Sequence, residues 1–183
     1  EAIRAKMDLP IIYLTAYADE TTLKNAKITQ PFGYIIKPFE ERELHATLEM
    51  AFYRNVLETA LRESEKKHRT LVETMDEGIV IVDDNENFTF VNNAAVTIFG
   101  YPKEDLLKMS MRDFTSPAEF DYIRKKTQLR MEGVSDKYEL TITARGGHRH
   151  YTTVTASPMI IDGTYEGTFA VISDVTKRKK AEQ

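Results

Sequence analysis

No glycine or proline stands between Phe39 and Gly78, and this uninterrupted stretch constrains the fold more than any other part of the chain. Glycine and proline are the residues that most often end or bend a helix. Apolar residues in the first part of the stretch recur at helical spacing on one face, namely Leu44, Leu48, Ala51 and Phe52. We therefore predict one long helix from residue 40 to about residue 74, whose first part packs on the residues before it.

The second part of this predicted helix carries a heptad seam. Its members alternate in spacing between four and three: Leu57, Leu61, Ser64, His68, Leu71 and Met75. Such spacing is typical of coiled coils, so we expect residues 55–75 to pair with the same helix of a second chain, as a homodimer. Ser64 and His68 would weaken the seam but help to fix its register. Because His68 lacks the acidic residue and proline that follow a phospho-accepting histidine, we interpret it as a polar seam residue.

Residues 9–36 predict a strand, a helix and a second strand. The apolar run at 9–14 suits a strand covered on both faces, and the run at 34–36 suits another. The polar stretch at 19–27 between them suits a short exposed helix. A strand–helix–strand unit of this kind is expected to be parallel, with a right-handed crossover.

Thr15 at the end of the first strand, with the motif Gly-Tyr-x-x-Lys-Pro-Phe at 33–39, resembles a response-regulator receiver domain from its fourth strand onward. The resemblance implies that Thr15 and Lys37 contact a phosphoryl group, that a cis-prolyl bond follows Lys37, and that Tyr34 changes rotamer on phosphorylation. One hydroxyl and one ammonium would supply the donors and the charge that a phosphoryl group needs. Taken singly, these residues have a simpler interpretation, in which Thr15 ends a strand, Lys37 is solvated and Tyr34 is a surface aromatic.

A large part of such a domain would precede Glu1, including its first three strands, the acidic pair that holds Mg²⁺ and the phospho-accepting aspartate. We therefore expect Mg²⁺, and a phosphodonor histidine kinase as partner, only for an intact receiver. The fourth strand would lack its inner neighbour, so we expect the remnant to pair with another copy or to be poorly ordered. Because the first residue is Glu and not Met, we expect the chain to be a piece of a longer protein.

Residues after Gly78 predict a run of short strands and helices. The strands are expected at 79–82, 88–92, 138–144, 151–161 and 167–174, and the helices at 93–99, 103–109, 116–131 and from 177 onward. Gly146-Gly147 and Asp162-Gly163 mark the turns between the later strands.

Residues from about 65 to 183 resemble a PAS domain. The resemblance is carried by Glu-Gly-Ile-Val-Ile-Val-Asp at 77–83, Val-Asn-Asn-Ala-Ala at 91–95 and Phe-Gly-Tyr at 99–101. It implies a five-stranded antiparallel sheet with flanking helices. The expected fold is thus α+β, a PAS fold preceded by a partial flavodoxin-like receiver remnant and a long linking helix. The expected boundaries are 1–54 for the receiver portion, 55–75 for the coiled coil, 76–176 for the PAS domain and 177–183 for the start of an output helix.

Asp174-Val175-Thr176, followed by Arg178, resembles the motif that couples the last PAS strand to the output helix. The Thr176 hydroxyl can cap that helix. Asp174 lies four residues before Arg178, the spacing of a helical ion pair. The alternative is a solvent-exposed pair worth under about 1 kcal/mol.

The PAS pocket is not expected to hold a haem or a flavin. Haem-binding relatives use a histidine on the long helix before the third strand, and residues 116–131 contain none. Light-sensing flavin chemistry needs a cysteine, and the chain has none. Seven large residues are candidates for a pocket that binds a small organic molecule: Phe90, Phe99, Phe114, Tyr122, Met131, Tyr138 and Phe169. The favoured alternative is that they fill a closed core.

Composition excludes other classes of function. The net charge of −4 gives no strong attraction to nucleic acid, so we interpret the basic run at 177–180 as a solvated helix start. No apolar run approaches the roughly 20 residues that cross a bilayer, and the absence of cysteine fits the cytoplasm. No catalytic constellation stands out, so an enzyme is not expected, although many proteins of this architecture are histidine kinases. The leading hypothesis is a regulatory fragment in phosphorelay signal transduction, and the alternative is a PAS-based sensor of a bound ligand.

Overall fold

A computed structural model describes residues 9–16 and 31–181 of the chain. The chain divides into two compact units, Glu1–His68 and Arg69–Gln183. The long helix α2 (Glu41–Thr74) begins in the first unit and ends in the second. Its unbroken course, through Asn55 and beyond, confirms the helix predicted from the absence of glycine and proline.

The first unit contains two parallel strands. β1 (Ile12–Thr15) pairs with β2 (Gly33–Ile36), with Ile12 opposite Gly33 and Thr15 opposite Ile36. The predicted parallel pairing is therefore confirmed, whereas the helix predicted at 19–27 lies outside the described residues. The peptide bond between Lys37 and Pro38 is cis.

The first part of α2 packs on β2, as expected. A Cβ atom added to Gly33 would lie 2.9 Å from Cγ2 of Thr47, and Ala51 is fully buried. The guanidinium of Arg54 stands 5.7 Å from the centre of the Phe32 ring. Phe52, predicted to share this face, is instead exposed, because successive helix residues are turned by about 100° and the buried face is centred on Ala51.

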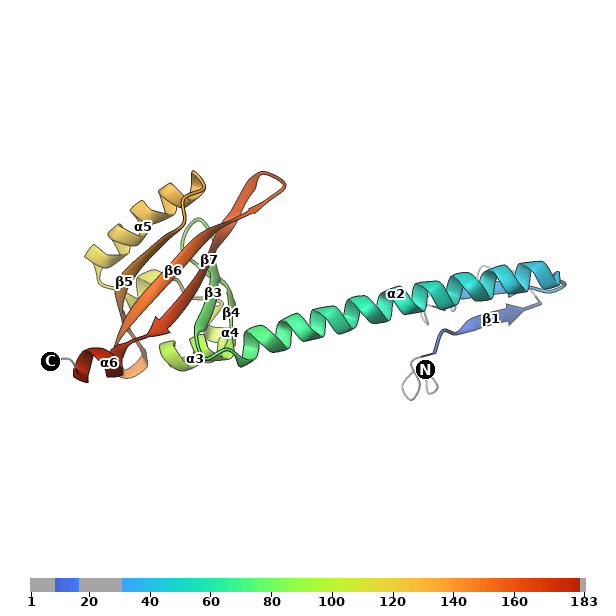
Figure 1. The fold of residues 1–183 in the computed structure, drawn as a ribbon, viewed down its shortest axis with the longest axis horizontal. Helices are drawn as coiled ribbons and strands as arrows, with labels where there is room; N and C mark the ends of the chain where they lie inside the picture. The colour runs from blue at the N-terminus through green and yellow to red at the C-terminus, as the bar shows by residue number, and fades with distance from the viewer. Residues whose placement is uncertain (1–8, 17–30, 182–183) are drawn as a thin grey trace. The chain divides into compact units, whose positions relative to one another are not determined.

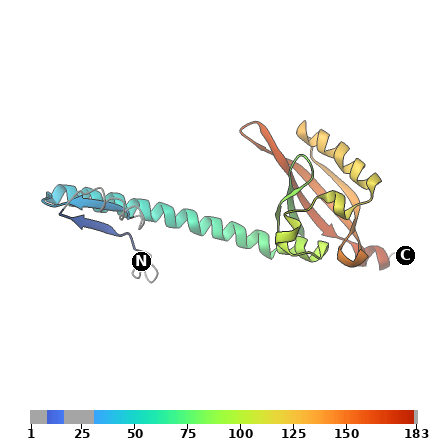
Figure 2. The ribbon, with the colours of Figure 1, turned by 180° about the vertical axis from the view of Figure 1, so that it is seen from behind.

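The second unit is a five-stranded antiparallel sheet covered on one face by helices (Figures 1 and 2). The spatial order of the strands is β4-β3-β7-β6-β5. The strands are β3 (Gly78–Val82), β4 (Phe88–Val91), β5 (Asp136–Thr143), β6 (Arg149–Ile161) and β7 (Thr164–Asp174). The helices are α3 (Asn93–Phe99), α4 (Lys103–Leu106), the 3₁₀ turn η1 (Met111–Phe114), α5 (Pro117–Met131), the 3₁₀ turn η2 (Arg145–Gly147) and α6 (Thr176–Ala181).

Local signals in the sequence set several helix ends. Ser116 caps α5 in a reciprocal pair with Glu119, and Pro117 occupies the first helical position. Gly100 ends α3 with a φ of 76°, a conformation that glycine adopts without steric cost. The helix predicted at 103–109 is shorter in the structure, where α4 ends at Leu106.

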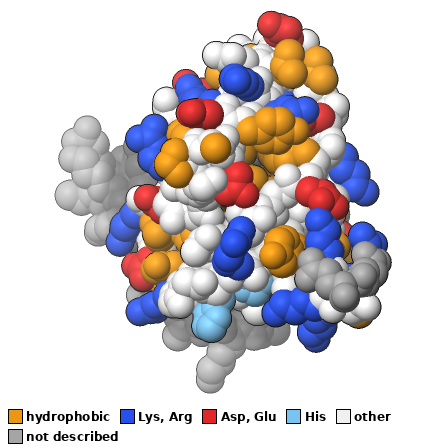
Figure 3. Space-filling model, turned by 90° about the vertical axis from the view of Figure 1, so that its left-hand side faces the viewer, with side chains coloured by type: hydrophobic (Ala, Val, Ile, Leu, Met, Phe, Trp, Pro, Cys, Tyr) orange, Lys and Arg blue, Asp and Glu red, His pale blue; other side chains and the backbone are white. Residues whose placement is uncertain are grey.

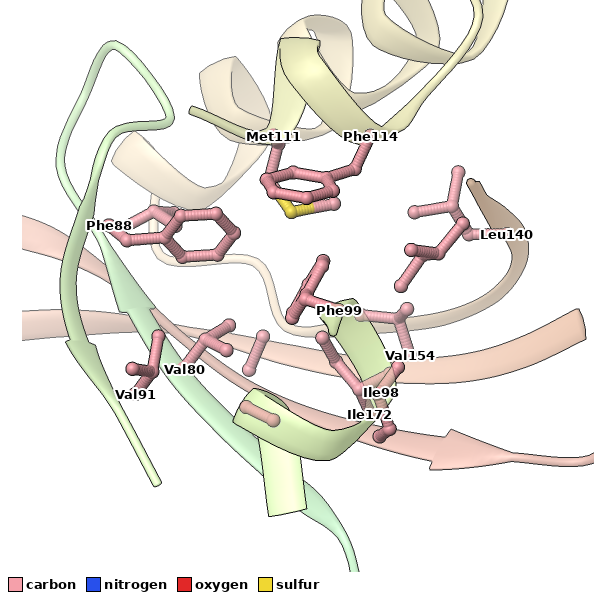
Figure 4. Packing of buried hydrophobic residues seen from close by; sticks show 14 of the residues in the cluster. Val80, Phe88, Val91, Ile98, Phe99, Met111, Phe114, Leu140, Val154 and Ile172 are labelled. Carbon is pink, nitrogen blue, oxygen red and sulfur yellow. The ribbon is translucent and has the colours of Figure 1, made fainter. Parts of the chain in front are cut away.

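The core of this unit lies between the sheet and the helices. Figure 4 shows strand residues such as Val80, Val154 and Ile172 pointing toward Phe99 and Phe114 from the helical side. The rings of Phe88, Phe99 and Phe114 meet edge to face, with centroids 4.7–5.9 Å apart. Edge-to-face contact is the favoured geometry for aromatic pairs, and it closes the core around this trio.

Candidate functional site

Asn92 forms hydrogen bonds at the junction between the end of α2 and the start of the sheet. Its side chain is fully buried and uses all four hydrogen bonds that an amide can make. The Oδ1 atom accepts from the backbone N–H groups of Ile79 (2.8 Å) and Ala95 (2.9 Å), and so caps α3. The Nδ2 atom donates to the carbonyl oxygens of Val72 (2.9 Å) and Glu77 (3.0 Å). One side chain therefore joins the last turn of α2, the start of β3 and the first turn of α3.

Glu73 adds a second attachment for the same turn of α2. Its carboxylate accepts from the backbone N–H of Asn93 and from the ammonium of Lys103, both at 2.9 Å. The Lys103 ammonium also stands 4.9 Å from the centre of the Phe90 ring. The final turn of α2 is thus fixed to α3 and α4 through side chains as well as through Asn92.

An open groove of about 450 Å³ lies beside this junction. It is lined by Glu73, Thr74, Met75, Asp76, Asn93, Ala94, Thr97, Ile98 and Asp174. Asp174 is the last residue of β7 and precedes α6, so the groove lies between the end of α2 and the start of α6.

Asp174 organises the start of α6. One carboxylate oxygen accepts from the backbone N–H of Thr176, and the other lies 2.8 Å from Nδ1 of His150. The Thr176 hydroxyl accepts from the backbone N–H of Tyr151 at 2.9 Å. Asp174 thus accepts from the first backbone N–H of α6, whereas the hydroxyl of Thr176, which was predicted to cap this helix, accepts from the backbone of Tyr151. The predicted pairing of Asp174 with Arg178 stays a prediction. Arg178 lies exposed on α6, where the neighbouring Lys179 pairs with Glu139 at 2.6 Å.

The pKa of Asp174 lies below its ordinary value. Partial burial alone would raise this pKa, but the hydrogen bonds from Thr176 and the hydrogen bond and charge of His150 outweigh it.

A direct contact joins the segment after α2 to the end of β7. The hydroxyl of Ser173 donates to the carboxylate of Glu77 at 2.5 Å. Gly78 pairs with Ile172 in the antiparallel ladder between β3 and β7. Glu77 and Ser173 are the next residues beyond that pair, so they lie opposite each other. This contact lies between the end of α2 and the cap of α6.

A small cavity of about 20 Å³ lies inside the core. It is lined by Val80, Val82, Glu86, Met111, Ile123, Arg130, Tyr138, Leu140, Val154, Thr168, Ala170 and Ile172. That volume holds about one water molecule. Among the described residues, this cavity therefore leaves room for no more than a water-sized group.

Buried charged groups form one end of this cavity. The carboxylate of Glu86 accepts a hydrogen bond from the hydroxyl of Thr127. Arg130 donates to Asp136 and to the hydroxyl of Tyr138, both at 3.1 Å. Burial raises the pKa of Glu86 even though Thr127 and Arg130 act in the opposite direction. A charged or polar ligand atom would find both a donor and an acceptor here.

The sequence placed too many aromatic residues in the pocket. Among the seven candidates only Tyr138 lines the cavity, while Phe99 and Phe114 fill the core beside it. Phe169 is 38% exposed, because successive strand residues point to opposite faces and its neighbours face the core. Tyr122 and Met131 lie on the exposed side of α5, and Phe90 is only half buried. The candidate interpretation for those four as interior residues was wrong.

Sequence reasoning missed Glu86 and Arg130. Arg130 had a usable signal, since it continues the buried row of α5 that runs Phe120, Ile123, Thr127. Glu86 had none, because it sits in a polar turn between two strands and its partners lie on α5.

The backbones of Thr15 and Lys37 are neighbours in the structure. The backbone N–H of Lys37 donates to the carbonyl oxygen of Thr15 at 2.7 Å, at the carboxyl end of the parallel pair. Tyr34 is 53% exposed on β2. The contact with a phosphoryl group, and the rotamer change of Tyr34, stay predictions.

The seam residues of α2 are exposed on the chain. Leu57, Leu61 and Leu71 are 52%, 62% and 51% exposed, and Ser64 and His68 are exposed with them. Met75 lies just beyond the end of α2, so Leu71 is the last of the predicted seam residues on the helix. Whether a second chain covers these residues stays a prediction.

The face shown in Figure 3 carries basic and acidic side chains side by side, with hydrophobic side chains in small separate groups. Nucleic-acid surfaces instead gather basic residues in one stripe or patch. In the part of the chain that the structure describes, no group of histidine and acidic side chains is arranged to hold a metal ion. None of the described helices is long and apolar enough to span a membrane.

Residues 66–175 match the family model described as the PAS fold. Two curated relatives are sensors. The chain is 32% identical over 126 residues to the methyl sulfide methyltransferase-associated sensor of Methanosarcina acetivorans, covering 67% of this chain and 12% of that protein. It is 22% identical over 211 residues to the sensor histidine kinase TmoS of Ectopseudomonas mendocina, covering 96% of this chain and 22% of that protein. The chain thus spans less than a quarter of the length of either relative.

Solved structures show the same fold. The PAS domain of an HTR-like protein from Haloarcula marismortui aligns with a TM-score of 0.58 at 19% identity, covering 64% of this chain and 96% of that chain. A domain of the sensory box sensor histidine kinase/response regulator from Geobacter sulfurreducens aligns with a TM-score of 0.54 at 18% identity, covering 62% of this chain and 96% of that chain. At such identities, the likeness concerns the fold alone.

Proposed function

The chain belongs to the PAS family, and from that premise we propose that it is a cytoplasmic relay module in phosphorelay signal transduction. In this proposal α2 delivers a signal to the PAS domain, and α6 begins the output. The observation that carries it is the continuity of α2, which packs on β2 with its first part and is hydrogen-bonded by Asn92 at its last turn.

We assign residues 1–54 to the C-terminal portion of a receiver domain. The parallel pair β1–β2 and the contact between Thr15 and Lys37 support this assignment. Leu14, Tyr34 and Ile36 are exposed on these two strands, and an intact receiver domain would cover such apolar side chains. In the intact receiver, Mg²⁺ and a phosphodonor histidine kinase would act upstream of α2.

We further propose that α2 pairs with its copy in a homodimer. The support is the row of exposed leucines at 57, 61 and 71 on one unbroken helix. Burying a leucine side chain contributes about 1.5–3 kcal/mol, so a solvated row of this kind favours association. A change in the pairing of two helices is a mechanical signal that each PAS domain would receive at Asn92.

The test is the solution mass of the complete chain by light scattering. We expect a dimer, and we expect the double variant Leu61→Lys/Leu71→Lys to be a monomer with an unchanged circular dichroism spectrum. Leu129→Lys, which changes a leucine on α5 that is 45% exposed, is the matched control and stays dimeric. A monomeric native chain at high micromolar concentration would overturn the pairing.

A ligand-sensing module is the second candidate. It is favoured by Glu86 and Arg130, two buried charged residues that both line the cavity. Native mass spectrometry of the purified chain distinguishes the two proposals, because a sensor retains a small molecule and a ligand-free relay does not. An enzyme is the third candidate function. Measurable ATP turnover by this chain would establish that function and would contradict our proposal.

A further inference from the structure

We propose that the hydrogen bond between Ser173 and Glu77 is the contact through which the end of α2 controls α6, and that Asn92 is the positioning residue for it. This inference deepens the relay proposed above and rests on it. The proposed series of contacts runs from the end of α2 through the neighbouring ends of β3 and β7 to α6. It does not involve the cavity in the core.

The first step is the attachment of α2. Asn92 donates to the carbonyl oxygens of Val72, in the last turn of α2, and of Glu77, just before β3. Its other two hydrogen bonds go to Ile79 and Ala95, which belong to the sheet and to α3. Because all four bonds of a buried amide are used, the end of α2 cannot move without moving Glu77 or breaking a buried hydrogen bond.

The second step is the passage from β3 to β7. The backbone of Glu77 is held by Asn92, and its side chain reaches across to Ser173 at 2.5 Å. Glu77 lies opposite Ser173 because Gly78 and Ile172 are paired in the antiparallel ladder. A displacement of Glu77 is therefore transmitted to the last residues of β7.

The third step is the cap of α6. Ser173 is followed directly by Asp174, whose carboxylate accepts from the backbone N–H of Thr176 and is held by His150. Thr176 is in turn bonded to the backbone of Tyr151 on β6. The orientation of Asp174 thus decides whether the first turn of α6 is capped.

The cavity is a separate feature. None of Glu77, Asn92 or Ser173 lines it, whereas Glu86, Arg130 and ten other residues do. The route from α2 to α6 is therefore complete without a ligand in the core, which fits a relay better than a ligand sensor.

The experiment follows the backbone amide resonances of Thr176 and Tyr151 by nuclear magnetic resonance in the complete chain. Asn92→Asp keeps the two accepting bonds but turns a carboxylate toward the carbonyl oxygens of Val72 and Glu77, so it disturbs the end of α2. We expect it to shift both reporter resonances by more than a linewidth. In the background Ser173→Ala, we expect the same change to leave both resonances in place.

Two further variants make the result specific. Ser173→Thr keeps the hydroxyl and is expected to retain the response to Asn92→Asp. Ser157→Ala removes a hydroxyl from β6 without touching Glu77, and the response is expected to persist there as well. If Ser173 had a merely structural role, the response to Asn92→Asp would be the same in Ser173→Ala as in Ser173→Thr and Ser157→Ala.

The proposal fails if both reporters respond equally with and without the Ser173 hydroxyl, or if they respond in neither background. Should Asn92→Asp not fold, Glu73→Gln disturbs the same turn of α2 through its contacts with Asn93 and Lys103 and takes its place. Light scattering on the same samples reports the pairing of α2 separately. A monomeric chain with intact coupling would refute the homodimer alone, and a dimer without coupling would refute this inference alone.

Discussion

The carboxylate of Glu86 and the hydroxyl of Thr127 are 41 positions apart in the chain and hydrogen-bonded to each other inside the core. Both side chains are buried, and Glu86 has a φ of 67°, in the left-handed region that residues other than glycine and asparagine seldom adopt. A buried carboxylate on an unfavourable backbone is more typical of a functional group than of a packing residue. The contact ties the turn between β3 and β4 to α5.

Replacing Glu86 with Gln should remove a pH dependence of stability. Burial raises the pKa of Glu86 in the folded state above 4.5, against the lowering effect of Thr127 and Arg130. The folded state therefore binds the proton more tightly, so this group contributes stability below pH 4.5 that is lost as the pH rises through the folded pKa. The facing groups Arg124, Asp83 and Tyr165 are unchanged in Glu86→Gln.

The measurement is urea unfolding of both proteins from pH 4 to pH 8. We expect Glu86→Gln to be more stable than the native chain at pH 8 by about 1 kcal/mol, the size of a typical single substitution, and to show a flatter profile. Glu132→Gln changes an exposed glutamate and is expected to follow the native profile. Parallel profiles for Glu86→Gln and the native chain would refute this account.

The cap of α6 should be lost at low pH. Partial burial raises the pKa of Asp174, but the hydrogen bonds from Thr176 and His150 bring it below 3.8. This group contributes stability above pH 3.8 that is lost as the pH falls through its folded pKa. Asp174→Asn should remove this contribution and increase hydrogen exchange in α6 at pH 7, with the amides of β5 unchanged. An unaltered exchange rate in α6 would contradict the capping role.

Gly167→Ala should unfold the PAS domain. A Cβ atom at this position would run into the carbonyl oxygen of Val82, and the φ of 142° is unfavourable for alanine. Thermal melting should show a loss of more than about 3 kcal/mol. Gly133→Ala is the matched control, because Gly133 also has a positive φ but no atom within 4 Å. That variant should lose only about 1–2 kcal/mol, and equal losses would show that backbone strain alone explains both.

Two phenylalanines distinguish the core from the outer face of the sheet. Phe99 is fully buried against Phe88 and Phe114, whereas Phe169 is more than a third exposed. Phe99→Ala should cost about 3–5 kcal/mol in the free energy of unfolding, since it leaves a cavity. Phe169→Ala should cost much less, and chemical denaturation of the two variants gives the comparison. Similar costs would mean that Phe169 is covered in solution, for example by a partner.

Much of the fold was predictable because its signals are local. The helix at 41–74 follows from a stretch without glycine or proline, and the start of α5 follows from Ser116 and Pro117. Strand positions followed from apolar runs separated by turns such as Gly146-Gly147. These signals act within a few residues, so they survive without knowledge of the rest of the chain.

The candidate site was less predictable because its contacts join distant residues. The sequence singled out Asp174 and Thr176, but not the contact between Asp174 and His150, which lies 24 positions away. Asn92 was visible only as part of a family motif, and its bonds to Val72 and Glu77 were not. A hydrogen bond made by a side chain depends on two positions in the chain. The periodic pattern around one partner does not indicate where the other partner lies.

The sequence by itself determined, to within a few residues, where most of the described helices and strands lie, and that the second unit is a PAS fold. Only the tertiary structure decided which face of each element is buried, as Phe52, Tyr122 and Phe169 show. It alone also placed Glu86 and Arg130 in the core, because a charged side chain is stable there only beside partners such as Thr127 and Asp136. Periodicity reports that an element has two faces, whereas burial depends on what packs against them.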